Sequence, residues 1–148
     1  MIRKRLVTNA VAQMLASGSG KPVGKGKMPQ ADPPYYILYS LDTELSGAPL
    51  ADENEDASFV YQITSVSGPD PTVVSSGGSE DQTEWLADKS REVFLARDPA
   101  TGLWVNQLVI AGYKNYCREL DTEPGGTSDP ADAIISYVQR FRFDLTPA

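Results

Sequence analysis

The chain contains no histidine and a single cysteine, Cys117. The absence of histidine excludes Ser-His-Asp and Cys-His catalysis, and it removes the commonest protein ligand of zinc. One cysteine cannot close a disulfide within the chain. Because no neighbouring base is present to activate its thiol, we expect Cys117 to be chemically inert. These two shortages argue against an enzyme and against a zinc protein.

Long apolar runs are also missing. No stretch approaches the ~20 consecutive apolar residues of a membrane-spanning helix. The N-terminal segment has basic residues like a signal peptide, yet its apolar part is interrupted by Thr8, Asn9 and Gln13. The chain has 148 residues, of which 41% are hydrophobic, and this suffices for the core of one domain. We therefore expect one domain that makes no contact with a membrane.

No nucleotide-binding motif is complete. The loop at 17–34 holds two Gly-Lys pairs, but Lys21 is followed by Pro22 and Lys27 by Met28. The phosphate-binding loop requires Ser or Thr at that place, where the hydroxyl holds the metal of the nucleotide. We therefore expect no nucleotide at this loop.

An acidic run at 52–56 has the spacing of the first ligands of a calcium-binding loop. The sixth position needs glycine but holds Ala57, and the twelfth needs Glu but holds Ile63. We predict no metal site and no cofactor. The 20 acidic residues leave catalysis by paired carboxylates as an alternative, although nothing in the sequence places two of them in one cleft.

The charges are distributed unevenly along the chain, whose net charge is −7. Six basic residues precede the first acidic residue, Asp32, and the remainder holds 20 acidic residues against seven basic ones. Net negative charge opposes free binding of nucleic acid, because phosphate neutralisation supplies most of that affinity. A molecule with one basic end attracts the acidic face of another copy. The six basic residues are Arg3, Lys4, Arg5, Lys21, Lys25 and Lys27.

This division of charge leads to a hypothesis about self-association. Basic side chains of the 17–34 loop in one copy pair with the acidic run of the next copy. Exposed ion pairs contribute only about 0–1 kcal/mol each, so several must act together. The charged residues of this candidate subunit interface are Lys21, Lys25, Lys27, Asp52, Glu53, Glu55 and Asp56.

Two segments have the periodicity of amphipathic helices. The first, at 2–16, is ended by glycines and followed by a flexible Gly/Lys/Pro loop at 17–34. The second begins at Ser79, which stands three residues before Gln82 as in a capping box, and it ends at Asp98 before a proline. The apolar stripe of the first helix comprises Ile2, Leu6, Val7, Ala10, Val11, Met14 and Leu15.

Four other segments have the character of strands. The segment at 102–113 is apolar without a clear period, so its form stays open between a short strand and a loop. The order of helices and strands predicts an α+β fold: a single domain with a mostly antiparallel sheet, flanked by an N-terminal helix and a central helix. The predicted strands lie at 35–41, 58–66, 114–121 and 134–145, and the loops between them at 42–57, 67–78 and 123–130.

The strand at 35–41 is apolar on both faces. Tyr35 and Ile37 lie on one face, and Tyr36 and Leu38 lie on the other. Such a pattern is typical of an interior strand or of a face that a partner covers. We therefore add Tyr36 and Leu38 to the candidate subunit interface.

The order of the elements and several of their sequences resemble a known family. The most specific segments are FVYQITSV at 59–66, EWLAD at 84–88 and YVQRFRF at 137–143. With these segments the chain is similar, over nearly its whole length, to the tail-terminator proteins of siphophages that infect actinobacteria. The segments are packing patterns and contain no chemical signature.

The resemblance implies an α+β subunit that assembles with itself into a ring, usually of six copies. Such a ring caps the tail tube at the head-proximal end of the virion's tail, stops tube polymerisation and joins the tail to the head. The implied partners are the major tail tube protein and a head-completion or connector protein. Genomic DNA is expected to pass through the lumen without specific binding, and assembly is expected in the host cytoplasm. The family implies no catalytic residues.

Three other functions stay open at this stage. The chain could be another virion joining protein, such as a head-completion or connector-stopper subunit. It could be a small enzyme that uses carboxylates, although the lack of histidine and of cofactor motifs counts against this. It could also be a binding module unrelated to viruses.

Overall fold

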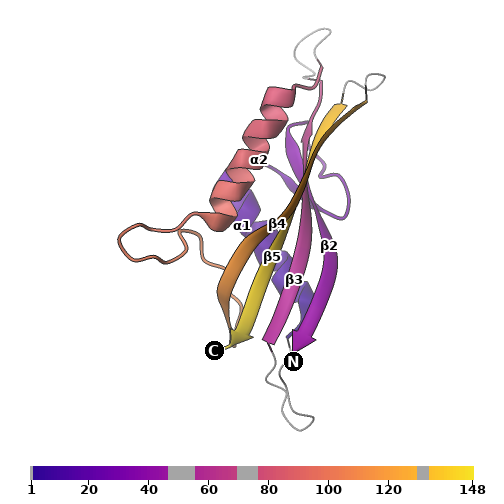
Figure 1. The fold of residues 1–148 in the computed structure, drawn as a ribbon. Coiled ribbons are helices and arrows are strands. Elements are labelled where there is room, and N and C mark those ends of the chain that lie inside the picture. The colour runs from indigo at the N-terminus through magenta and orange to yellow at the C-terminus, as the bar shows by residue number, and fades with distance from the viewer. Residues whose placement is uncertain (1, 47–55, 70–76, 130–133) are drawn as a thin grey trace.

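Two helices lie against one five-stranded sheet in the computed structural model, which describes residues 2–46, 56–69, 77–129 and 134–148 (Figure 1). The predicted α+β fold with an N-terminal helix and a central helix is confirmed. In chain order the elements are α1 (Lys4–Ser19), β1 (Val23–Lys25), β2 (Tyr35–Ser46), β3 (Asp56–Ser67), α2 (Glu80–Leu95), β4 (Tyr113–Asp129) and β5 (Ile134–Pro147).

The strands are arranged in the order β1-β2-β3-β5-β4. Only the short pairing of β1 with β2 is parallel; β2 with β3, β3 with β5, and β4 with β5 are antiparallel. The central pair, β3 and β5, is in register without interruption from Ala57↔Leu145 to Ser67↔Ile135. One edge of the sheet is therefore formed by β1 and β2, and the opposite edge by β4.

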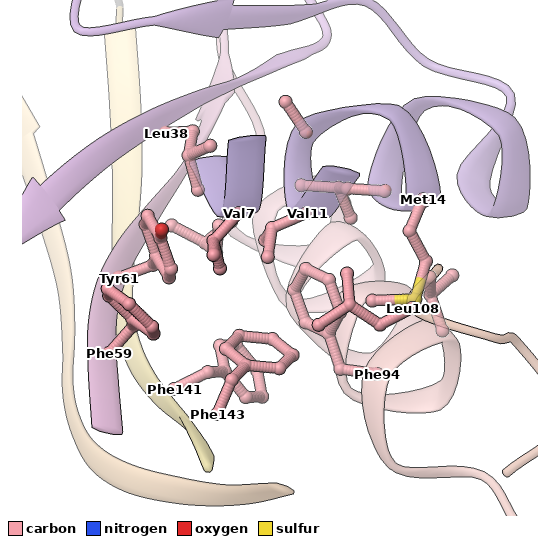
Figure 2. Close-up of a cluster of buried hydrophobic side chains, with 14 of the residues drawn as sticks. Val7, Val11, Met14, Leu38, Phe59, Tyr61, Phe94, Leu108, Phe141 and Phe143 are labelled. Carbon is pink, nitrogen blue, oxygen red and sulfur yellow. The ribbon is translucent and has the colours of Figure 1, made fainter. Parts of the chain in front are cut away.

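The core lies between the helices and one face of the sheet (Figure 2). Because side chains alternate along a strand, β3 and β5 direct every second residue toward the helices. Phe94 of α2 makes edge-to-face contacts with Phe141 and Phe143, with ring centroids 4.9 and 5.3 Å apart. Such pairs contribute about 0.5–1.5 kcal/mol each beyond the burial of their area. They anchor the C-terminal end of α2 on β5.

Helix α1 is displaced from its predicted bounds by two to three residues. Its buried stripe includes Val7, Val11 and Leu15, as predicted, but Leu6 is exposed. Gly20 ends the helix in the left-handed conformation at φ 71°, and its N–H donates to the carbonyl of Ala16.

Helix α2 begins where its capping residues predict. Ser79 is the N-cap, and its side chain accepts a hydrogen bond from the Gln82 N–H. The Gln82 side chain is used differently from a capping box: its Oε1 accepts from the Ser67 hydroxyl at 2.5 Å, and Ser67 Oγ in turn accepts from the Ser79 N–H at 3.0 Å. The end of β3 and the start of α2 are thereby fixed to each other.

Three predicted loops are in part wrong. The flexible loop at 17–34 contains β1, which is held to β2 through the backbone of Tyr36 and Leu38. β2 extends to Ser46, so the loop predicted at 42–57 begins later. β4 continues through 123–129, because bulges accommodate Pro124 and the left-handed Gly125 without ending the strand.

A close approach of the two helices leads to a first prediction. A Cβ atom at Gly18 would lie 2.8 Å from Val93 Cγ1 of α2. We expect Gly18→Ala to lower the free energy of unfolding, because overpacking costs about 1–3 kcal/mol and exceeds the helix-propensity gain of about 1 kcal/mol. In a Val93→Ala background the same substitution is expected to be neutral or stabilising. Urea unfolding of the wild type, the two single variants and the double variant measures whether the effect of Gly18→Ala on the free energy of unfolding changes sign. Stabilisation by Gly18→Ala alone would contradict the prediction.

Candidate functional site

The structure places two of the predicted interface residues in the core of the monomer. Tyr36 and Leu38 are fully buried, and Leu38 points into the cluster shared with α1 (Figure 2). The Tyr36 hydroxyl donates to the carbonyl of Leu86 at 2.6 Å, and burial raises the pKa of Tyr36. The prediction that these two side chains form a subunit interface is therefore wrong. The opposite face of β2 is apolar because Tyr35 and Ile37 form a second, smaller buried cluster.

The basic residues of the predicted interface already have contacts within the subunit. Lys25 Nζ donates to Asn9 Oδ1 of α1 at 2.7 Å. Lys21 Nζ lies over the ring of Trp85 of α2, 5.8 Å from its centroid. Lys27 is exposed. The segment that carries these lysines is thus attached to both helices.

Only one acidic residue of that interface, Asp56, lies among the described residues. Asp52, Glu53 and Glu55 fall outside the described residues, whereas Asp56 is exposed and its Oδ1 accepts from the Thr146 hydroxyl at 2.7 Å. β1 pairs next to Tyr36, and Asp56 pairs with Ser46, ten residues further along the strand. At about 3.3 Å per residue the two ends are roughly 30 Å apart. An ion pair between Asp56 and one of these lysines therefore requires two copies of the chain.

The edge formed by β2 is half open. Among the described strands, β1 pairs with Tyr36–Leu38, and the rest of β2 has no partner on that side. Lys4 Nζ donates to the Leu41 carbonyl at 2.7 Å, which protects one backbone group at this edge. Further along, Asp42 and Glu44 are exposed, and Leu45 is 52% exposed. We call Asp42, Glu44 and Leu45 the acidic edge.

Beyond the opposite edge, a segment between α2 and β4 projects into solvent (Figure 1). It begins as a short hairpin in which Arg97 and Trp104 pair as an isolated bridge. The segment exposes Leu103 to 63%, Val105 to 57% and Val109 to 81% of their surfaces. In the sequence this stretch is apolar, but neither the helical nor the strand period assigns it to an element, so no local pattern predicts an exposed surface here.

Trp104 brings two arginines together at this edge. The guanidinium carbons of Arg97 and Arg118 lie 4.1 and 4.8 Å from the centroid of its ring. Arg118 is only 6% exposed; its Nη1 donates to the Phe94 carbonyl at 3.1 Å, and its Nε donates to Asn115 Oδ1. Burial, and secondarily the charge of Arg97, lower the pKa of Arg118 to about 10. In the described part of the chain, neither arginine forms an ion pair.

A second polar group of residues lies under α2. Arg91 donates through Nη2 to both carboxylate oxygens of Glu123, at 2.7 and 2.9 Å. Buried Gln139 donates to Glu123 Oε1 at 2.7 Å, and its own Oε1 lies 2.5 Å from the Ser90 hydroxyl. Burial opposes ionisation of Glu123, but the hydrogen bonds from Arg91 and Gln139 outweigh it and hold its pKa below the usual range. The carboxylate is therefore suited to fastening α2 to the sheet and poorly suited to general acid catalysis near neutral pH.

Other chemical features of the described residues have structural explanations. Burial and the nearby Asp144 carboxylate raise the pKa of Cys117, so the thiol stays protonated, as an inert cysteine should. Arg142 Nε lies 3.2 Å from Glu119 and 3.3 Å from Asp144. No group of three residues suited to hold a metal ion occurs within the described ranges. No helix there is long and apolar enough to cross a membrane.

Comparison with known proteins supports the fold. No protein-family model and no curated protein matches the chain. Among solved structures, 31 chains match. One of them, a protein whose designation states no function, aligns over 100% of both chains with a TM-score of 0.53 and 15% identity. At this level of identity the likeness shows the fold alone.

The Glu123 carboxylate leads to a second prediction, about pH. Its lowered pKa means that ionised Glu123 stabilises the fold above the pKa of the unfolded chain, and that this contribution disappears as the pH falls through the lower pKa of the folded state. We expect Glu123→Gln to lower the free energy of unfolding at pH 7 by about 1–2 kcal/mol, reduced by the partial exposure of Arg91. Urea unfolding at pH 7 and near pH 3 should show a smaller difference from the wild type in acid. An equal difference at both pH values, or the same behaviour in an exposed control, Glu84→Gln, would contradict this role.

Proposed function

We propose that the chain is a virion structural protein that forms a ring, caps the tail tube of a long-tailed phage and joins the tail to the head. The observation that carries this proposal is that the two edges of the sheet are both accessible and chemically unlike. One edge presents the acidic edge of β2, and the other presents exposed apolar side chains beside Arg97 and Arg118. The resemblance of segments 59–66, 84–88 and 137–143 to tail terminators is the reason for assigning this ring to a phage tail.

Unlike edges favour rings over two-fold dimers. A two-fold interface uses the same patch on both subunits and would place like charges together. A head-to-tail contact joins one edge to the other and closes into a ring when the rotation between subunits allows it. The net charge of −7 also suits a ring whose lumen lets DNA pass without holding it. In this proposal the major tail tube protein and a connector protein are the neighbours, and the ring is located at the head-proximal end of the tail.

The third prediction tests this function directly. Light scattering of the purified chain is expected to give several times the 16.0 kDa subunit mass, and electron microscopy is expected to show rings. Added to polymerising tail tube protein, the rings should bind tube ends and limit tube length. Binding to portal complexes in place of tubes would identify a connector-stopper subunit instead. A monomer at high concentration that leaves tube growth unchanged would refute the proposal.

A further inference from the structure

The hairpin beside β4 is held in place by its own hydrogen bonds. The Asp98 N–H donates to the Leu103 carbonyl at 2.8 Å, and the Val105 N–H donates to the Ala96 carbonyl at 3.0 Å. The turn is closed by the Gly102 N–H, which donates to the Asp98 carbonyl at 2.7 Å, with Gly102 in the left-handed conformation at φ 71°. A binding segment fixed in this way loses little conformational entropy when it meets a partner.

This hairpin presents a surface that combines apolar side chains with uncompensated positive charge. Leu103 and Val105 line a hollow of about 500 Å³ together with Arg97 and Trp104. Val109 lines a second hollow, of about 350 Å³, with Arg118. Exposed apolar side chains that cluster in this way mark interaction sites more often than isolated ones do. We call the six residues the arginine–tryptophan surface: Arg97, Leu103, Trp104, Val105, Val109 and Arg118.

The missing counter-charge indicates the chemistry of the partner. A buried arginine such as Arg118 is normally paired, because an unpaired charge is costly to remove from water, whereas Arg97 is exposed. In a chain with 20 acidic residues, no described carboxylate lies within ion-pair distance of Arg97 or Arg118. Asp98 lines the same hollow as Arg97, but its Oδ1 accepts from the Ala100 N–H. A partner that brings a carboxylate and an apolar side chain would complete this surface.

Resting on the ring proposed above, we propose that the arginine–tryptophan surface of one copy receives the acidic edge of the next. The acidic edge offers the complementary set, because Asp42 and Glu44 are exposed carboxylates and Leu45 is an exposed apolar side chain. Asp42 and Glu44 also line a hollow with Asp121 and Arg142 of the same subunit. β2 and β4 stand on opposite sides of the central β3–β5 pair, so a subunit cannot satisfy its own surface. Each copy therefore uses one edge for each neighbour, which is the head-to-tail contact that a ring requires.

This arrangement differs from pairing between Lys21, Lys25 and Lys27 and the acidic run at 52–56. Pairing of these lysines with Asp56, the described member of that run, would join subunits end to end along the strands, whereas edge pairing joins them side by side across the sheet. The structure favours edge pairing, because Lys21 and Lys25 already have partners in their own subunit, while Arg97 and Arg118 have no carboxylate. One experiment distinguishes edge pairing from lysine pairing.

The test reverses one charge on each side of the contact. Arg97→Glu and Glu44→Arg, both at exposed positions, are each expected to raise the concentration for half-maximal assembly about tenfold or more, as measured by light scattering. The double variant R97E/E44R is expected to recover assembly, because every contact then has its charges exchanged. An equal mixture of the two single variants should also recover it, since alternating copies match at every contact. Arg5→Glu and Glu84→Arg, which change the net charge equally at exposed helix positions, are expected to leave assembly unchanged.

The outcomes separate this inference from the function on which it rests. If the chain forms rings that cap tubes, but Arg97→Glu and Glu44→Arg assemble like the wild type, the edge contact is wrong and the ring function stands. If in addition the triple reversal of Lys21, Lys25 and Lys27 to Glu abolishes assembly, end-to-end pairing replaces it. If the double variant R97E/E44R recovers self-association but the assemblies do not bind tail tubes, the edge contact is right and the proposed function is wrong. A wild-type chain that stays monomeric at high concentration would overturn the contact itself.

Discussion

The need to cover one face of the sheet organises the whole molecule. β3 and β5 run side by side in unbroken register and place large aromatic side chains on the same face, where Phe141, Phe143 and Tyr61 are at most 1% exposed to solvent. Burying a side chain of this size contributes about 1.5–3 kcal/mol, so leaving the face uncovered would forfeit a large part of the stability of the domain. Both helices pack on this face and cover it. The helices leave the two edges of the sheet uncovered, and on the opposite face Tyr35 and Ile37 belong to the second, smaller buried cluster.

Polar groups inside this core fix how the helices are seated. Ser67 connects the end of β3 to the cap of α2, and Gln139 of β5 connects Ser90 to the Glu123 carboxylate of β4. Apolar contacts tolerate small sliding movements, whereas a buried hydrogen bond that loses its partner costs about 1–3 kcal/mol. These side chains therefore set the position of α2 along the sheet. That position in turn sets where the segment leaving α2 emerges, which is beyond β4, at the edge that carries the arginine–tryptophan surface.

The sequence predicted those elements whose pattern is local. The alternation at 59–66 and the capping spacing of Ser79 depend on neighbouring residues, and both predicted their elements correctly. β1 has three residues, and it exists because the outer side of β2 at Tyr36–Leu38 offers backbone groups to pair with, which no local pattern reveals. The extension of β4 was missed because a Pro-Gly-Gly stretch is typical of a turn. Here the left-handed Gly125 and the neighbouring bulges keep the strand paired with β5.

The candidate surface was harder to predict than the fold, because its parts are distant in sequence. A hydrophobic strand face can be covered by a helix or by another subunit, and composition does not distinguish the two, so Tyr36 and Leu38 were assigned to the wrong partner. The basic N-terminal segment and the acidic remainder suggested two ends, whereas the fold brings Arg97 and Arg118 together beyond one edge of the sheet and leaves Asp42 and Glu44 exposed at the other. Arg97 and Arg118 meet only because both contact Trp104.

The proposed contact between unlike edges also addresses a difficulty that net charge poses for self-association. Copies of a chain with a net charge of −7 repel one another at long range, and this repulsion is reduced by salt over a Debye length of about 8 Å at physiological ionic strength. Contacts at a desolvated edge act at 3–5 Å and are screened much less. The long-range term therefore keeps free copies apart at low salt, and the short-range terms decide which edges remain together once they meet. A buried arginine such as Arg118 suits that short-range part, since its charge is held rigidly by Trp104, Asn115 and the Phe94 carbonyl.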